Sequence, residues 1–266
     1  MNTRRPIVSL ITILSLIFLY VPSLAVAVFS VNNARYGLVW KGFSWRWYEM
    51  LFKNEAILDA ALNSLLVAGV STLVATILGT ALAISLDRFP WPRRLVKAMD
   101  FLVHLPVVTP DIILAAALVL SFNFLRGFSS LFDLGLGTLI VGHITFQISF
   151  VTLVVRSRLA ALGKDIDEAA RDLYASGAYL FFRVTLPLLT PGILAGAMLA
   201  FTLSLDDFII SFFCHGPDSV TLPIYIYSSV RRGVSPEIHA LSTLVLLATV
   251  LLVLLAERLS RLQNKA

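Results

Sequence analysis

Six long apolar runs limit what this sequence can fold into. Each run is long enough for a helix to cross about 30 Å of hydrocarbon. Only 14% of the residues are charged, and the mean hydropathy is +0.86, so the chain is unlike a soluble globular domain. We predict an all-α integral membrane protein with one transmembrane domain over residues 1–266 and six transmembrane helices, which lie at about 7–29, 60–86, 101–125, 136–155, 188–213 and 240–256.

The basic residues predict how these helices are oriented. Lys and Arg near the ends of membrane spans are retained on the cytoplasmic side. If the N-terminus is cytoplasmic, the inner segments hold 14 of the 21 Lys and Arg residues. We therefore expect a multi-pass protein with both termini in the cytoplasm.

The sequence argues against several classes of function. A pI near 9.6 suggests nucleic-acid binding, but the positive charge is spread over span ends and forms no compact basic module. The sequence contains no G-x-x-x-x-G-K-[ST] phosphate loop and no H-E-x-x-H pair, and its four histidines are scattered. We expect no catalytic residue, metal site or cofactor in this chain, and membrane lipid rather than nucleic acid around it.

Proline and small residues mark two of the predicted spans. Pro106 and Pro110 lie four residues apart in the third span and remove two amide donors, which predicts a kink or a break there. Gly192, Gly196 and Ala200 recur at four-residue intervals in the fifth span. Such a stripe lets another helix approach closely, so we expect it to serve packing.

The segment from about 161 to 187 is a long charged loop between apolar spans. Residues from Glu168 onward read as a helix whose first turn is acidic, which complements the helix dipole. Ala169, Ala170 and Leu173 give this helix a small apolar face. The residues alone leave two alternatives open: a face that fits a cleft in a soluble partner, or an amphipathic connector lying on the membrane surface.

A resemblance to a known family favours the partner. Glu168-Ala169-Ala170 followed by Val184-Thr-Leu186-Pro187 resembles the EAA loop of permease subunits in bacterial ATP-binding-cassette (ABC) importers. Two further stretches, 204–211 (SLDDFIIS) and 221–237 (TLPIYIYSSVRRGVSPE), are similar to the permeases of the spermidine/putrescine group. The resemblance covers essentially the whole chain. It implies a type I ABC importer permease fold with cytoplasmic coupling helices, in which the residues that contact the ATPase are Glu168, Ala169, Ala170, Leu173, Tyr174, Gly177, Leu186 and Pro187.

The resemblance also implies a function and a set of partners. The chain is expected to be a bacterial inner-membrane subunit that forms a polyamine pathway and works by alternating access. Its partners would be a cytoplasmic ABC ATPase dimer, a second, different permease subunit and a periplasmic or extracytoplasmic solute-binding protein. ATP and Mg²⁺ are expected in the ATPase and not in this chain.

One residue departs from the family pattern. The family places glycine where this chain has Tyr174, and a glycine follows three residues later at Gly177. A left-handed turn residue other than glycine costs about 1–2 kcal/mol. Either the turn has moved to Gly177, or Tyr174 packs on the partner.

Three carboxylates fall within the apolar runs. Asp206 and Asp207 lie in the predicted fifth span and Asp111 follows Pro110 in the third. Burying a carboxylate at membrane depth costs about 2.5–3.5 kcal/mol, so such a residue faces a cavity, a partner charge or a pathway. An acidic lining would attract cationic cargo, whereas a structural role would pair each Asp with an amide, a hydroxyl or an Arg. Tyr225 and Tyr227 could stack on a cation or anchor the chain at the membrane interface.

Three other functions remain open. The chain could be the same kind of ABC permease with a different small solute. It could be a self-sufficient proton-coupled carrier in which one of the three aspartates titrates. It could also be an assembly scaffold that transports nothing.

Overall fold

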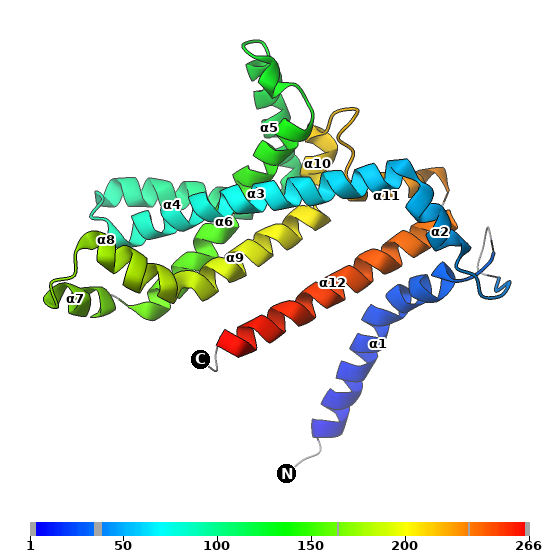
Figure 1. Ribbon diagram of the computed structural model, residues 1–266, viewed down its shortest axis with the longest axis horizontal. Coiled ribbons are helices and arrows are strands. Elements are labelled where there is room, and N and C mark those ends of the chain that lie inside the picture. The colour runs from blue at the N-terminus through cyan, green and yellow to red at the C-terminus, as the bar shows by residue number, and fades with distance from the viewer. Residues whose placement is uncertain (1–3, 35–38, 164, 234, 264–266) are drawn as a thin grey trace. The chain divides into compact units, whose positions relative to one another are not determined.

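The described part of the chain consists of helices joined by turns and loops. The computed structural model describes residues 4–34, 39–163, 165–233 and 235–263. Position 164 of the predicted loop 161–187 and position 234 of the stretch 221–237 therefore lie outside the described residues. No strand occurs in these ranges, only an isolated bridge between Asn32 and Phe43. The all-α class is confirmed, with the elements shown in Figure 1: α1 (Arg4–Ser30), α2 (Arg46–Lys53), α3 (Glu55–Arg88), α4 (Arg93–Val108), α5 (Asp111–Leu125), η1 (Ser130–Phe132), α6 (Leu136–Leu162), α7 (Asp165–Asp172), α8 (Gly177–Tyr179), η2 (Leu180–Thr185), α9 (Leu186–Asp206), α10 (Ile209–Cys214), α11 (Leu222–Arg232) and α12 (Pro236–Gln263).

The number of helices able to span a membrane is lower than six in the described ranges. Four meet the requirements of length and apolarity: Val8–Ser30 within α1, α3, α6, and Gly177–Asp206, which joins α8, η2 and α9. The pair α4 and α5 makes a fifth if it is counted as one broken span. In α12, the apolar stretch Pro236–Leu251 is shorter.

The predicted third span, 101–125, is not one straight helix. Helix α4 ends at Val108, α5 begins at Asp111, and the two are bent by 111°, so in Figure 1 α5 leaves the direction of α4 sharply. Pro110 causes the break, because a proline disfavours helical backbone in the residue before it. Thr109 is accordingly extended, with φ −73° and ψ 134°. The expected break is confirmed at Pro110, whereas Pro106 lies inside α4.

The predicted fifth span, 188–213, is also wrong as a single helix. The helical segment starts earlier, at Gly177, and ends at Asp206. Asp207 is extended (φ −66°, ψ 121°) and separates α9 from α10. The break forms because the Asp207 carboxylate accepts hydrogen bonds from the amides of Ile210 and Ser211, an arrangement that starts a new helix and competes with the old one.

The chain forms two compact units, and the larger comprises residues 59–224. Within it, α3, α6 and α9 pack closely along their small residues. Gly196 and Ala200 face Val151 of α6 and its neighbours, and Gly192 lies against the side chain of Arg158. A Cβ atom at Gly79 of α3 would lie 2.8 Å from Cβ of Val151. The packing role predicted for the stripe is therefore confirmed.

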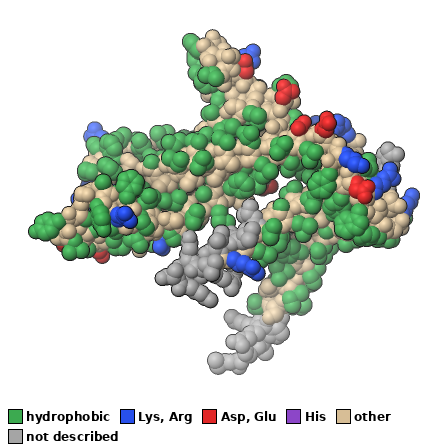
Figure 2. All heavy atoms as spheres, in the orientation of Figure 1, with side chains coloured by type: hydrophobic (Ala, Val, Ile, Leu, Met, Phe, Trp, Pro, Cys, Tyr) green, Lys and Arg blue, Asp and Glu red, His purple; other side chains and the backbone are tan. Residues whose placement is uncertain are grey.

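A second apolar cluster in this unit joins α3, α5, α6 and α10. Its members include Val67, Phe122, Leu139 and Ile210, and the free thiol of Cys214 is buried among them. The short helix α5 thus gains its place in the unit mainly by packing on α10, and α10 packs in turn on α6. Figure 2 shows hydrophobic side chains over much of the visible face of α3, α4 and α9, as expected of helices surrounded by lipid.

The smaller unit comprises residues 1–58 and 225–266. In it α12 packs against α1 and α2. Trp47 of α2 is buried and donates from Nε1 to the backbone oxygen of Asn32 at 2.7 Å. The side chain of Asn54 donates to the Tyr225 hydroxyl and to Glu237, which fixes the start of α12.

Two glycines of α3 allow a test of this packing. We expect Gly79→Ala to destabilise the protein by about 1–3 kcal/mol, because the added methyl overlaps Val151 in a filled contact. Gly69→Ala is the matched control, since a Cβ there meets no atom within 4 Å. Thermal unfolding in detergent measures both, and equal midpoints for the two variants would contradict the close packing.

Candidate functional site

Helix α7 (Asp165–Asp172) is the helix that the sequence predicts in the charged loop, and it carries Glu168, Ala169 and Ala170. Its first turn holds three acidic residues and its last turn holds Arg171. The first turn thus complements the helix dipole, whereas in the last turn the charge of Asp172 offsets that of Arg171. None of its described residues is buried, so α7 presents nearly its whole surface outside the bundle.

Helix α7 ends in a Schellman motif. The amide of Ala175 donates to the oxygen of Ala170 at 3.1 Å, and that of Tyr174 donates to Arg171 at 2.9 Å. These are the 6→1 and 5→2 hydrogen bonds of this motif, whose C′ residue is left-handed and most often glycine. Tyr174 occupies C′ with φ 60°. The glycine of the family pattern therefore corresponds to the left-handed C′ position of this motif.

The turn has not moved to Gly177. Among the described residues, Tyr174 is the one non-glycine with positive φ, and the positive-φ glycines are Gly42, Gly163 and Gly233. Gly177 instead opens α8, where the Ser176 hydroxyl accepts from the amide of Tyr179 at 3.3 Å. Tyr174 therefore keeps the left-handed turn, at a cost of about 1–2 kcal/mol.

Two large side chains extend from this turn into open space. Leu173 is 82% exposed and Tyr174 is 97% exposed. After α8, the π-helix η2 leads into α9, and Leu186 and Pro187 form its first residues. Leu186 is half-buried and Pro187 is exposed. The predicted coupling residues therefore lie on α7, the following turn and the start of α9, in one continuous segment.

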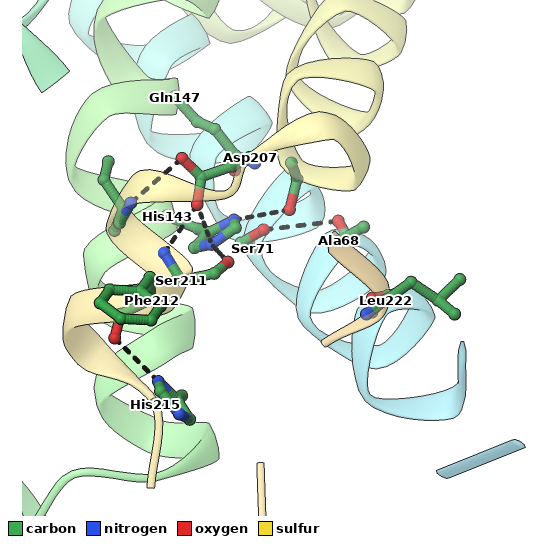
Figure 3. A network of polar contacts seen from close by, with 12 residues as sticks. Ala68, Ser71, His143, Gln147, Asp207, Ser211, Phe212, His215 and Leu222 are labelled. Carbon is green, nitrogen blue, oxygen red and sulfur yellow. Dashed lines mark hydrogen bonds and ion pairs between the residues drawn. The ribbon is translucent and has the colours of Figure 1, made fainter. Parts of the chain in front are cut away.

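Asp207 lies in a different part of the larger unit, at the break between α9 and α10 (Figure 3). Its carboxylate accepts from the amides of Ile210 at 3.3 Å and Ser211 at 2.7 Å. Its Oδ2 is also 3.4 Å from Nε2 of His143, and its side chain is 11% exposed. These are contacts with protein groups, of the kind expected for a structural role.

His143 connects the two sides of this break. It is 1% exposed on α6, its Nδ1 is 2.7 Å from the hydroxyl of Ser204 on α9, and its Nε2 is 3.1 Å from that of Ser211 on α10. Figure 3 shows the ring between Asp207 and Ser211. Sequence reasoning missed this residue because it treated the histidines together as scattered. The available signal was an ionisable side chain inside an apolar run.

The other predicted pathway residues are more open. Asp206, the last residue of α9, and Asp111, the first of α5, are both exposed. In the smaller unit, Tyr225 is half-buried with its hydroxyl near the Asn54 amide, at 3.4 Å. The Arg231 guanidinium lies 5.9 Å from the centre of the Tyr227 ring. Asp206 and Asp207 are thus adjacent in sequence but differ in their surroundings.

The chain matches known transport proteins in sequence. A family model described as "Binding-protein-dependent transport system inner membrane component" matches residues 75–266. The chain is 42% identical over 246 residues to the putrescine transport system permease protein PotI of Escherichia coli (strain K12), covering 91% of this chain and 86% of that protein. It is 38% identical over 247 residues to the spermidine/putrescine transport system permease protein PotC of Haemophilus influenzae, covering 93% of each.

Solved structures match the fold. A chain of a bacterial ABC transporter involved in the import of the acidic polysaccharide alginate aligns with a TM-score of 0.78 and 20% identity, covering 97% of this chain and 94% of that one. A chain of the MetNI methionine ABC transporter in an inward-facing conformation aligns with a TM-score of 0.64 and 19% identity, covering 82% and 98%. At these identities the likeness supports the type I permease fold.

Substitutions at Tyr174 test the left-handed turn. Asn tolerates this conformation and Val does not, although both remove the ring. We expect Tyr174→Val to loosen the end of α7 by about 1–2 kcal/mol relative to Tyr174→Asn. Hydrogen exchange at the amides of residues 173–175 measures the difference. Equal exchange in the two variants would show that the turn does not need a left-handed residue.

Proposed function

Because the chain belongs to the family of binding-protein-dependent transport system inner membrane components, we propose that it is the permease subunit of an ABC importer for polyamines. In this function it is a multi-pass inner-membrane protein that forms part of the pathway for spermidine or putrescine. The named relatives transport these solutes, and they match nearly the whole of this chain. The chain itself performs no covalent step.

One observation supports the coupling function above all. Helix α7 buries none of its described residues, yet its C-terminal turn is closed by two Schellman hydrogen bonds and exposes the large side chains of Leu173 and Tyr174. A short rigid helix with an unpaired apolar end is suited to a cleft in another protein. We assign that cleft to the ATPase, where ATP and Mg²⁺ would be bound and hydrolysed.

The remaining partners follow from the same function. Two copies of the ATPase would bind α7 in the cytoplasm. The distribution of Lys and Arg in the sequence supports a cytoplasmic location for both termini as well. A second, different permease subunit would complete the pathway, and a periplasmic solute-binding protein would deliver the polyamine. Movement of α7 would open the pathway to each side in turn.

Asp206 is a better candidate for the pathway than Asp207. A helix that ends inside a membrane domain presents unpaired carbonyl groups and the negative end of its dipole, which attract cations. Asp206 adds an exposed carboxylate at this end of α9, whereas the carboxylate of Asp207 already bonds to two amides and lies beside His143. Asp111, Tyr225 and Tyr227 remain further candidates for contact with the cargo.

Reversal of the Glu168 charge tests the coupling function. In vesicles that hold the whole importer, we expect Glu168→Lys to insert and assemble but to lose ATP-driven putrescine uptake by about tenfold or more, equivalent to at least 1.4 kcal/mol. Glu168→Gln, which removes the charge without reversing it, should lose less. Normal uptake by Glu168→Lys would refute the coupling function of this residue. Uptake driven by a proton gradient without the ATPase and the binding protein would instead support a secondary carrier.

The two adjacent aspartates give a second test. We expect Asp206→Asn to lower putrescine uptake about tenfold, a change of about 1.4 kcal/mol, with assembly unchanged. Asp207→Asn should instead destabilise the protein by about 1–3 kcal/mol, because two amides and a buried imidazole lose a charged partner. Uptake and thermal unfolding measured on both variants separate the roles. Unchanged uptake by an assembled Asp206→Asn complex would favour a scaffold without transport.

A further inference from the structure

Helix α7 is held to the larger unit by an arginine that the transport function above does not use. Arg88 is the last residue of α3. Its Nη2 donates to the backbone oxygen of Gly163 at 2.6 Å, and its Nε lies 3.1 Å from Oδ2 of Asp167. The side chains of Arg88 and Asp167 are 14% and 18% exposed. Arg88 therefore contacts both sides of the turn between α6 and α7.

The contact between Arg88 and Asp167 is electrostatic. The Nε–H of Arg88 is not directed so as to form a hydrogen bond, although the atoms are within ion-pair distance. The hydrogen bond to Gly163 fixes the guanidinium in place, so the charge stays beside Asp167. The width of the guanidinium lets Nη2 donate to the Gly163 oxygen while Nε lies beside the Asp167 carboxylate, whereas a lysine would have to make both contacts with one nitrogen.

The residue before Arg88 extends this contact to two more helices. Asp87 accepts from Nε of Arg156 on α6 at 3.0 Å, and Nη1 of Arg156 donates to Asp100 of α4 at 2.6 Å. These side chains are between 23% and 34% exposed. An isolated pair with this exposure contributes little to stability, whereas a shared network restrains geometry more strongly. Consecutive residues of α3 thus join α7 on one side to α4 and α6 on the other.

We propose that Arg88 and Asp167 form a clamp through which a displacement of α7 is passed to the ends of α3, α4 and α6. The clamp rests on the proposed coupling function, in which α7 has a mechanical role. It adds the residues that would carry the movement from α7 to the other helices. The clamp is needed because no described residue of α7 is buried, so apolar packing into the bundle does not fix the helix. Helix α7 also packs against η2, which leads into α9.

As a clamp, Arg88 and Asp167 are positioning residues, and their loss should cause a defect that differs from a simple loss of stability. If the network served stability alone, its loss would lower the amount of complex, and uptake and ATP hydrolysis would fall together. If the network transmits movement, ATP hydrolysis continues while putrescine uptake falls. The ratio of putrescine imported to ATP hydrolysed therefore distinguishes the two roles.

A double-mutant cycle tests the pair in vesicles that contain the whole importer. We expect Arg88→Gln and Asp167→Asn each to lower the ratio of uptake to hydrolysis by at least about threefold, and the double variant to be no worse than either single one. The matched controls are Arg93→Gln and Asp165→Asn, which remove the same charges at exposed positions of α4 and of the same first turn of α7. Losses that multiply in the double variant, or equal losses in the controls, would overturn the clamp.

Hydrogen exchange of the assembled complex provides a second test, which does not depend on transport. Asp167→Asn should raise exchange over residues 165–173 at least about threefold more than Asp165→Asn does, because only the former frees α7 from α3. Equal exchange in the two variants overturns the clamp. If the wild-type complex shows no ATP-driven uptake, the proposed transport function is refuted. The hydrogen-exchange measurement then tests the clamp by itself.

Discussion

The close contact of α6 with α9 is the interaction on which the larger unit depends. Apolar burial drives helix association weakly within lipid, so van der Waals contact and hydrogen bonds between helices must hold the unit together. Gly192 and Gly196 give α9 a surface without side chains, and α6 fills it with Val151 and the aliphatic stem of Arg158. Gly79 extends the same contact to α3. The polar bonds add to it, because Gln147 donates to the oxygen of Ala200 across the interface.

On this base the unit accommodates two broken helices. The break at Pro110 and the break at Asp207 both place backbone ends inside a membrane domain, where unsatisfied polar groups are costly. At the second break, the side chains of Asp207, His143, Ser204 and Ser211 bond to one another and to the freed amides. The same four residues hold α9 and α10 in place, which leaves Asp206 exposed at the helix end.

Much of this fold could be predicted from the sequence, and the failures have physical causes. The apolar runs predicted the helical class, the spacing of Gly192, Gly196 and Ala200 predicted a packed interface, and the EAA pattern predicted helix α7. The run 188–213 failed as one span because hydropathy cannot detect that a carboxylate caps a new helix. The contacts of Arg88 and His143 could not be predicted, because they join segments far apart in the sequence. The Tyr174 turn could be suspected from the missing glycine, but its position required the backbone.

The glycine contacts also restrict how α9 can move. Val151 and Arg158 fill spaces that exist only opposite Gly196 and Gly192, and adjacent residues of a helix are offset by about 1.5 Å along its axis. Because adjacent residues also point in different directions around the axis, sliding α9 along α6 would not exchange one residue for the next but would move each space away from the side chain that fills it. The filled contacts at Gly192 and Gly196 therefore oppose axial slippage of α9 along α6. A rearrangement of the larger unit that keeps these contacts would then involve other segments, such as the short helices α5 and α10, which begin or end at the two breaks.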